Sequence, residues 1–327
     1  DITLPDIIGE SPPSVAQSLA MTGRKVRRSN SRIQQILGVA RQVSRVTEEN
    51  NGSKFSVSMR HAFVPFKGGL LVAADYSQLE LRMIAHLSQD EKLIRILNED
   101  GDVFKQIAAQ WKGIHPENVT TQERQQAKQV CYGMIYGIGA KALGEQLGVE
   151  DNDAGAFIET FKAKYPGMRS YLRKTVESCR EKGYVQTILE RRRYLPGINS
   201  TNPHARAQAE RQAINTTVQG SAADLVKIAM VAIDEKLQIT FRDSQFTHRH
   251  NFQVGNKESL AYEGPPRGAY LVLQLHDELI YEVAQEDVTT AAKIIKTEME
   301  TAMKLSVHFP VKVKCGYSWG KLEEMDV

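Results

Sequence analysis

The sequence lacks the features of a membrane protein and of a disulfide-stabilised one. It has no run of about 18 apolar residues, so we expect no transmembrane helix and no membrane partner. Its cysteines, Cys131, Cys179 and Cys315, are scattered and odd in number, which indicates neither a disulfide framework nor a zinc site. This cysteine usage is typical of a reducing compartment, cytosolic or nuclear.

Further absences concern motifs and charge. Walker A, zinc-ligand and Ser-His-Asp patterns are missing. An initiator Met and a signal-peptide pattern are missing at Asp1, so we expect an internal start of a longer chain. Acidic residues are missing from Ser11 to Thr47, where arginine and lysine accumulate. Such a run is most often a solvated, mobile segment, and a contact with nucleic acid is the alternative.

The composition that is present is that of an ordinary globular protein. The 327 residues are 41% hydrophobic and 25% charged, enough for one large domain or two modest ones. The net charge of +3 is too small to establish a polyanionic partner.

The pattern of apolar residues predicts an α+β fold. An apolar run at 69–74 ends at Asp75 and predicts a buried strand, and a hairpin is predicted around His276-Asp277-Glu278. The residues between are mostly helical in pattern. Strands near both ends with helices between them indicate an antiparallel sheet with a largely helical insertion. Helices are predicted at about 91–184, 205–237 and 289–304, hairpin strands at 269–275 and 279–283, and a closing strand at 311–315.

Two aspartates occupy positions where a sheet can hold carboxylates rigidly. Asp75 ends a strand and Asp277 lies at the tip of the hairpin, with Glu278 beside it. Two such carboxylates brought together can bind two Mg²⁺ ions about 3.5–4 Å apart, as in phosphoryl-transfer sites. Each aspartate alone is more often a helix cap or turn former.

A capped helix carries cations and aromatics along one face. Thr120 and Glu123 form a capping-box pattern. Four residues then recur at every fourth position and share one face, which matches the phosphates, sugar and base of a nucleoside triphosphate. The alternative is an amphipathic helix with solvated cations. The four residues are Arg124, Lys128, Tyr132 and Tyr136.

Four segments together resemble family A DNA polymerases, over about Ser58 to Gly320. The first and second catalytic motifs of that family are similar to 75–82 (DYSQLELR) and 276–278 (HDE). The nucleotide-binding helix is similar to 124–137, and the palm helix and turn to 209–215 and 218–224. The resemblance implies a palm sheet with inserted fingers, part of a right-hand polymerase fold.

The resemblance also assigns roles to single residues. Asp75, Asp277 and the backbone carbonyl of Tyr76 would bind two Mg²⁺ ions, for which Mn²⁺ would substitute, and Glu278 would be an accessory carboxylate. Lys128 would bind the triphosphate and protonate pyrophosphate. The other nucleotide-binding residues would be Arg124, Tyr132, Tyr136, Gln78 and Glu80, the last as steric gate against a 2′-hydroxyl. The DNA-binding residues would be His276, Arg211, Asn215, Gln219, Arg191 and Arg192.

Within the family, the segments 58–66, 137–146 and 191–198 resemble the theta subfamily of animal polymerases. That likeness implies a nuclear enzyme of end joining and lesion bypass. Three positions depart from relatives. Bacterial relatives have a His near the position of Phe104, and family members generally have Gly at the position of Glu190. Many relatives have Phe at the position of Tyr132.

The implied organisation is an N-terminal segment with a basic insertion (1–57), palm (58–89), fingers (90–200) and palm again (201–327), with an insertion at about 240–267. The implied partners are primer–template DNA, a dNTP and an upstream thumb and exonuclease-like part of the same polymerase. Two alternatives stay open: a single-subunit RNA polymerase, and a non-catalytic DNA-binding fragment.

Overall fold

The computed structural model describes residues 46–50, 53–99, 101–241 and 268–327. The chain divides into two compact units, one ending at Phe63 and one beginning at Val64. In the first unit, β1 (Val46–Asn50) and β2 (Ser53–Val57) form an antiparallel hairpin, which the sequence did not predict. The basic segment and the insertion predicted at about 240–267 lie outside the described residues, apart from this hairpin and the start of the insertion.

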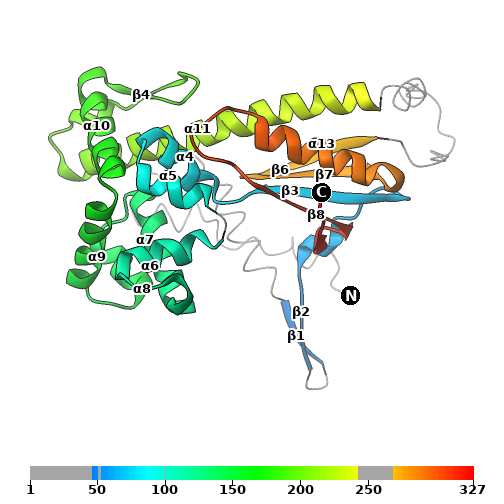
Figure 1. Cartoon of the computed structure of the whole chain (residues 1–327), viewed down its shortest axis with the longest axis horizontal. Coiled ribbons are helices and arrows are strands. Elements are labelled where there is room, and N and C mark those ends of the chain that lie inside the picture. The colour runs from blue at the N-terminus through cyan, green and yellow to red at the C-terminus, as the bar shows by residue number, and fades with distance from the viewer. Residues whose placement is uncertain (1–45, 51–52, 100, 242–267) are drawn as a thin grey trace, which may run out of the picture. The chain divides into compact units, whose positions relative to one another are not determined.

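The second unit is built on an antiparallel sheet (Figure 1). Within the described residues it has five strands in the order β6-β7-β3-β8-β9, so β3 lies in the centre. This architecture confirms the predicted fold class, although β9 was not predicted. The strands are β3 (Gly69–Tyr76), β6 (Ala269–Leu275), β7 (Glu278–Ala284), β8 (Val311–Ser318) and β9 (Lys321–Glu324).

Strand β3 is central because its residues are apolar on both faces. Leu71 and Ala73 pack with Ile280 on one face of the sheet, and Val72 and Ala74 belong to the main core on the other. A strand covered on both sides reads as a continuous apolar run, which is why the sequence predicted it.

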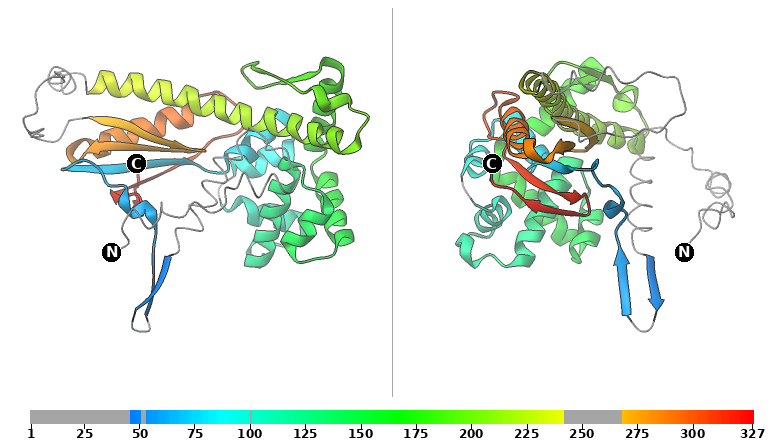
Figure 2. Two further views of the ribbon diagram at one scale, coloured as in Figure 1. Left: turned by 180° about the vertical axis from the view of Figure 1, so that it is seen from behind. Right: turned by 90° about the vertical axis from the view of Figure 1, so that its right-hand side faces the viewer.

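Two long helices run alongside the sheet, as Figures 1 and 2 show from opposite sides. They are α11 (Pro203–Thr240) and α13 (Val288–Thr301). Helix α11 has 38 residues, which corresponds to roughly 57 Å at 1.5 Å per residue. It therefore extends past the sheet and also reaches the helical part of the unit. Both helices agree with the predictions at 205–237 and 289–304, within three residues at each end.

The helical part forms the insertion between β3 and α11. It begins with α4 (Leu79–Ser88), and one buried carboxylate joins two of the helices that follow. The Oδ1 of Asp90 accepts the N–H of Leu93 in α5, and its Oδ2 accepts the N–H of Gly167 in α10. The other helices are α5 (Glu91–Asn98), α6 (Val103–Lys112), α7 (Thr121–Tyr136), α8 (Ala140–Leu147), α9 (Asp151–Lys164) and α10 (Pro166–Lys182).

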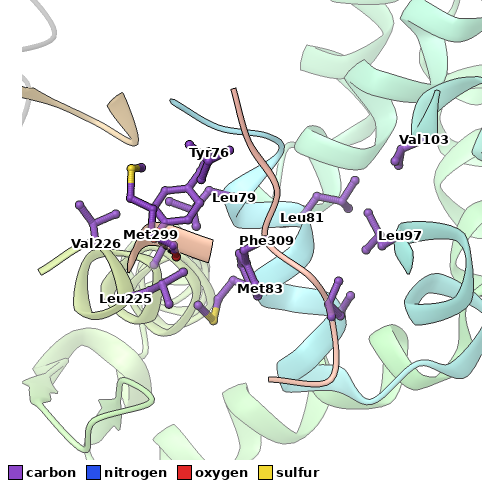
Figure 3. Packing of buried hydrophobic residues seen from close by; sticks show 14 of the residues in the cluster. Tyr76, Leu79, Leu81, Met83, Leu97, Val103, Leu225, Val226, Met299 and Phe309 are labelled. Carbon is purple, nitrogen blue, oxygen red and sulfur yellow. Dashed lines mark hydrogen bonds between the residues drawn. The ribbon is translucent and has the colours of Figure 1, made fainter. Parts of the chain in front are cut away.

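Helix α4 connects the sheet to the helical part through one continuous core (Figure 3). Leu79 and Met83 lie on the side of Met299 from α13, whereas Leu81 points toward Leu97 from α5. A helix that is apolar around most of its circumference is buried on most sides. The two parts of the unit therefore share a core and do not form separate ones.

A short hairpin, β4 (Tyr184–Gln186) with β5 (Arg192–Tyr194), follows α10. The sequence predicted helix as far as about Tyr184 and no hairpin. The predicted palm and fingers boundaries fall near the start of α5 and just before α11, and the assignment of these parts stays a prediction. No helix in the described ranges is long and apolar enough to cross a membrane.

Candidate active site

The sheet brings the predicted catalytic aspartates together at one end of two adjacent strands. Asp75 in β3 is paired in register with Glu278, the first residue of β7. Asp277 immediately precedes Glu278, and its carbonyl oxygen accepts the N–H of Tyr76 over 3.3 Å. Two residues far apart in the sequence thus become neighbours through strand pairing.

The turns on either side of these aspartates have unusual backbone conformations. His276 has a φ of 58° in the two-residue loop between β6 and β7, and Gln78 has a φ of 53° just before α4. A non-glycine residue in the left-handed region costs about 1–3 kcal/mol and is frequent at active sites and ligand clamps. Both strained residues were predicted to contact DNA or nucleotide.

The carboxylates are electrostatically coupled. Asp75 is exposed at the end of β3, but partial burial of its carboxyl group, followed by the charges of Asp277 and Glu278, raises its pKa to about 6. Burial also raises the pKa of Asp277 and that of Glu80. Hard carboxylate oxygens that repel one another in this way suit a divalent cation.

The described residues do not form a complete metal cage. No group of three or more His, Cys, Asp or Glu side chains in the described ranges could hold a metal ion by itself. Asp75 and Asp277 are two carboxylates from adjacent strands, and Mg²⁺ sites in proteins usually combine a few carboxylates with water and substrate phosphates.

A buried arginine fixes the chain just after Asp75. The Nε of Arg82 donates to the carbonyl of Ser77 over 2.9 Å, and its Nη1 donates to the carbonyls of Leu97 and His308. No role for Arg82 was predicted from the sequence. The one signal in the sequence was a charged residue at a helical position expected to be buried, because a buried charge needs partners. Its partners could not be predicted, because they are backbone carbonyls that tertiary structure brings together.

The four-residue stripe of α7 lies on one face of the helix as predicted, and the capping box of Thr120 and Glu123 is present. Phe104 of α6 lies against three of the four residues. Its ring centroid is 5.7 Å from the Cζ of Arg124, 5.8 Å from the Nζ of Lys128 and 6.1 Å from the Tyr132 ring.

The far end of the stripe reaches α4. Tyr132 and Tyr136 stack with centroids 6.3 Å apart, and the hydroxyl of Tyr136 donates to Glu80 Oε2. A side-chain hydrogen bond from Gln219 of α11 also reaches Glu80. Burial, and then the charges of Glu80, Asp277 and Asp75 among others, raise the pKa of Tyr132 to about 12, so this tyrosine lies close to the carboxylates.

Three predicted DNA-binding residues lie at four-residue intervals on α11. Arg211 and Gln219 are exposed, and the Oδ1 of Asn215 is buried with no hydrogen-bond partner among the described residues. The stem of Arg211 lies against Gly137, where an added Cβ would be 2.8 Å from the arginine Cγ. Gly137 has a φ of +64°, so it both ends α7 and leaves room for Arg211.

The two predicted DNA-binding arginines of the β4–β5 hairpin have different surroundings. Arg191 forms an ion pair with the buried Asp224 of α11 over 2.6 Å. Arg192 is exposed, with its Cζ 4.9 Å from the ring centroid of Tyr184. Glu190, in the turn before them, has a φ of 61°, a conformation that favours glycine.

Comparisons with known proteins find polymerases of one family. The family model described as "DNA polymerase family A" matches residues 8–321. The chain is 52% identical over 346 residues to DNA polymerase theta of Mus musculus, covering 100% of this chain and 13% of that protein. It is 40% identical over 261 residues to the thermostable DNA polymerase I of Thermus filiformis, covering 80% of this chain and 28% of that protein.

A solved structure is also similar. It is the POL domain of Pol1 from M. smegmatis in complex with DNA primer-template and dNTP, with a TM-score of 0.69 and 34% identity. The match covers 80% of this chain and 42% of that one. The chain thus spans only a small part of the curated relatives it matches, 13% in the mouse protein and 12% in DNA polymerase theta of Drosophila melanogaster.

Proposed function

The chain belongs to DNA polymerase family A, and from that premise we propose that it carries the palm and fingers of a template-directed DNA polymerase. The reaction is transfer of a nucleotide from a dNTP to a primer 3′-hydroxyl, with release of pyrophosphate. The observation that carries this proposal is that the aromatic end of the α7 stripe reaches the carboxylates: Tyr136 donates to Glu80, and the charges of Asp75 and Asp277 act on Tyr132.

The carboxylates would provide the metal site. Asp75, Asp277 and the carbonyl of Tyr76 would hold two Mg²⁺ ions, with Mn²⁺ able to substitute and Glu278 as an accessory carboxylate. When bound, such ions activate the attacking hydroxyl and stabilise the charge that develops at phosphorus. Arg82 keeps the segment after Asp75 in place through three backbone carbonyls.

The α7 stripe would bind the nucleotide. Arg124 and Lys128 would bind the phosphates, and Lys128 would donate a proton to the departing pyrophosphate. Tyr132 would pack on the sugar, and Tyr136 would lie at the templating base. Glu80, held by the Tyr136 hydroxyl, would occupy the space of a 2′-hydroxyl, with Gln78 beside the nucleotide.

The DNA would lie along α11 and the two hairpin turns. Arg211, Asn215 and Gln219 would contact the duplex near the new base pair, where minor-groove acceptors are nearly independent of sequence. The Oδ1 of Asn215, which is buried and has no partner in the part of the chain that the structure describes, supports a ligand on this face. His276 would place the primer terminus, and the exposed Arg192 and the anchored Arg191 would lie near the backbone.

A finer proposal concerns the biological role. The three theta-like segments and the similarity to the two animal proteins named DNA polymerase theta support a nuclear enzyme. It would act in repair by end joining and lesion bypass, together with an upstream thumb and exonuclease-like part.

The test is Mg²⁺-dependent primer extension by the polymerase that contains this chain and its upstream part. Asp277→Ala should nearly abolish extension, whereas Lys236→Ala, an exposed control on α11 well beyond Gln219, should leave it unchanged. Primer–template affinity should stay within about twofold for both variants, since the metals act on chemistry more than on DNA binding. DNA binding with no extension by the wild type would favour a non-catalytic fragment, and preference for rNTPs would favour an RNA polymerase.

A further inference from the structure

The α7 stripe packs against a second helix, α6, through the ring of Phe104. Phe104, in the first turn of α6, is only 3% exposed, and its ring lies within 5.8 Å of the charged ends of both Arg124 and Lys128. Cations within about 6 Å of an aromatic centroid are attracted by the ring quadrupole. One ring therefore contacts both side chains that are proposed to bind the triphosphate.

The residue before this turn holds Arg124 from another side. The Oδ2 of Asp102 lies 2.6 Å from the Nε of Arg124, while its Oδ1 accepts the N–H of Lys105 and caps α6. Although partial burial acts to raise it, the bonds from Arg124 and Lys105 hold the pKa of Asp102 below its usual value. Asp102 is thus a charged, fixed partner for the arginine.

These contacts leave the phosphate-binding atoms available. The Asp102 contact uses the Nε of Arg124 and so leaves its terminal nitrogens for a ligand. Lys128 has no carboxylate partner among the described residues. Long cationic side chains lose conformational entropy when they are immobilised on a ligand, and this loss is smaller if they are already held in place.

From this geometry we propose that Asp102 and Phe104 are positioning residues, which hold Arg124 and Lys128 in the arrangement that accepts a polyphosphate. The benzyl ring cannot donate a hydrogen bond to phosphate, so its effect is on the two cations. The proposal rests on the proposed polymerase function and deepens it.

The role of the Phe104 ring is tested by variants of the full polymerase. They distinguish the attraction of the aromatic face for the cations from the space that the side chain fills. Phe104→Leu and Phe104→Met keep an apolar side chain and remove the face, whereas Phe104→Tyr keeps it. The first two should raise KM for dNTP about three- to tenfold with kcat within about twofold, and Phe104→Tyr should resemble the wild type. Unchanged thermal midpoints and primer–template affinity exclude a folding defect.

Pyrophosphate provides a second readout, because it has phosphates but no sugar or base. KM for pyrophosphate in the reverse reaction should rise in parallel with KM for dNTP. Asp102→Asn should raise both constants by a similar factor, since Asn still caps a helix but lacks the charge that holds Arg124.

The outcomes separate this proposal from the proposed function. A wild-type enzyme with no template-directed extension overturns both. An active wild type in which Phe104→Leu and Asp102→Asn leave both KM values unchanged overturns the positioning role alone. The same holds if Phe104→Tyr is as impaired as Phe104→Leu, or if the variants lower only kcat.

Discussion

The Nε of Arg191 lies 2.6 Å from the Oδ1 of Asp224, in an ion pair whose carboxylate is 2% exposed and whose arginine side chain is 52% exposed. The same guanidinium donates to the carbonyl of Gly220, and the second carboxylate oxygen accepts the N–H of Leu189. The turn between β4 and β5 is thereby fastened to α11. Arg191 thus has a structural role that its neighbour Arg192 does not share.

Arg191→Ala should lower the free energy of unfolding by about 1–3 kcal/mol, because Asp224 would remain buried without its partner. Arg192→Ala should change it by less than about 0.5 kcal/mol, as is usual for exposed side chains. Urea unfolding measures both. Equal losses would contradict the different roles. If Arg192 contacts a phosphate, its removal should also reduce the salt slope of DNA binding by about one.

Glu80→Ala should relax the discrimination between dNTP and rNTP by about ten- to two-hundredfold, the range for one group that fills a pocket. The reason is that, in the proposed nucleotide site, the carboxylate would occupy the space a 2′-hydroxyl needs. Competitive incorporation of the two nucleotides measures this ratio. Tyr136→Phe is the matched control, since it removes the hydroxyl bonded to Glu80 and leaves the carboxylate, and it should have a smaller effect. A larger effect of the control would mean that Tyr136 itself excludes the hydroxyl.

Tyr132→Phe should reduce incorporation of dideoxynucleotides about ten- to hundredfold, while leaving normal dNTPs almost unaffected. A tyrosine phenol is protonated at neutral pH, and burial raises the pKa of Tyr132 further, to about 12, so it can donate a hydrogen bond to a nucleotide that lacks its 3′-hydroxyl. Hydrogen bonds to charged groups contribute about 1.5–3 kcal/mol. Single-nucleotide incorporation rates test this, and strong rejection of chain terminators by the wild type would refute it.

Asp75 should make the metal-free protein less stable as pH rises from about 4 to about 6. Its pKa in the folded state is about 6, against an ordinary value of 3.8, so between these values the folded state binds more protons than the unfolded state. The contribution of Asp75 to stability is therefore fully present below about pH 4 and is lost above about pH 6. Asp75→Asn should be more stable than the wild type above pH 6.

Urea unfolding in EDTA at several pH values tests this titration. The stability difference between Asp75→Asn and the wild type should shrink toward pH 4.5. A difference that grows as pH falls would show that Asp75 has a lowered pKa in the folded protein.

The sequence predicted the elements that are buried or long, and missed those that are short and exposed. Strand β3 was found because it is apolar on both faces, and α11 because its helical pattern continues for many turns. The β4–β5 hairpin was missed because Arg192–Tyr194 is exposed throughout and has no apolar alternation. The same holds for β9, where no residue is buried.

For the candidate site, motifs identified individual residues but not their supports. Asp75 and Asp277 could be singled out by their places at a strand end and a hairpin tip. Asp102 precedes a helix, so a cap could have been predicted from the sequence, but its pairing with Arg124 depends on how α6 packs against α7. Arg82 binds backbone carbonyls from three separate segments, which no local pattern specifies.

The central position of β3 has a consequence for how the chain folds. Its partners β7 and β8 are both encoded in the last third of the sequence, and the Tyr76 hydroxyl donates to the carbonyl of Met299, 223 positions later. During synthesis β3 therefore emerges long before either neighbouring strand, while the local contacts of α5–α10 can already form. The apolar faces of β3 stay uncovered and its backbone groups stay without strand partners until the hairpin that carries Asp277 has been synthesised. The pairing of Asp75 with the Asp277 turn is thus among the last features of this unit to assemble.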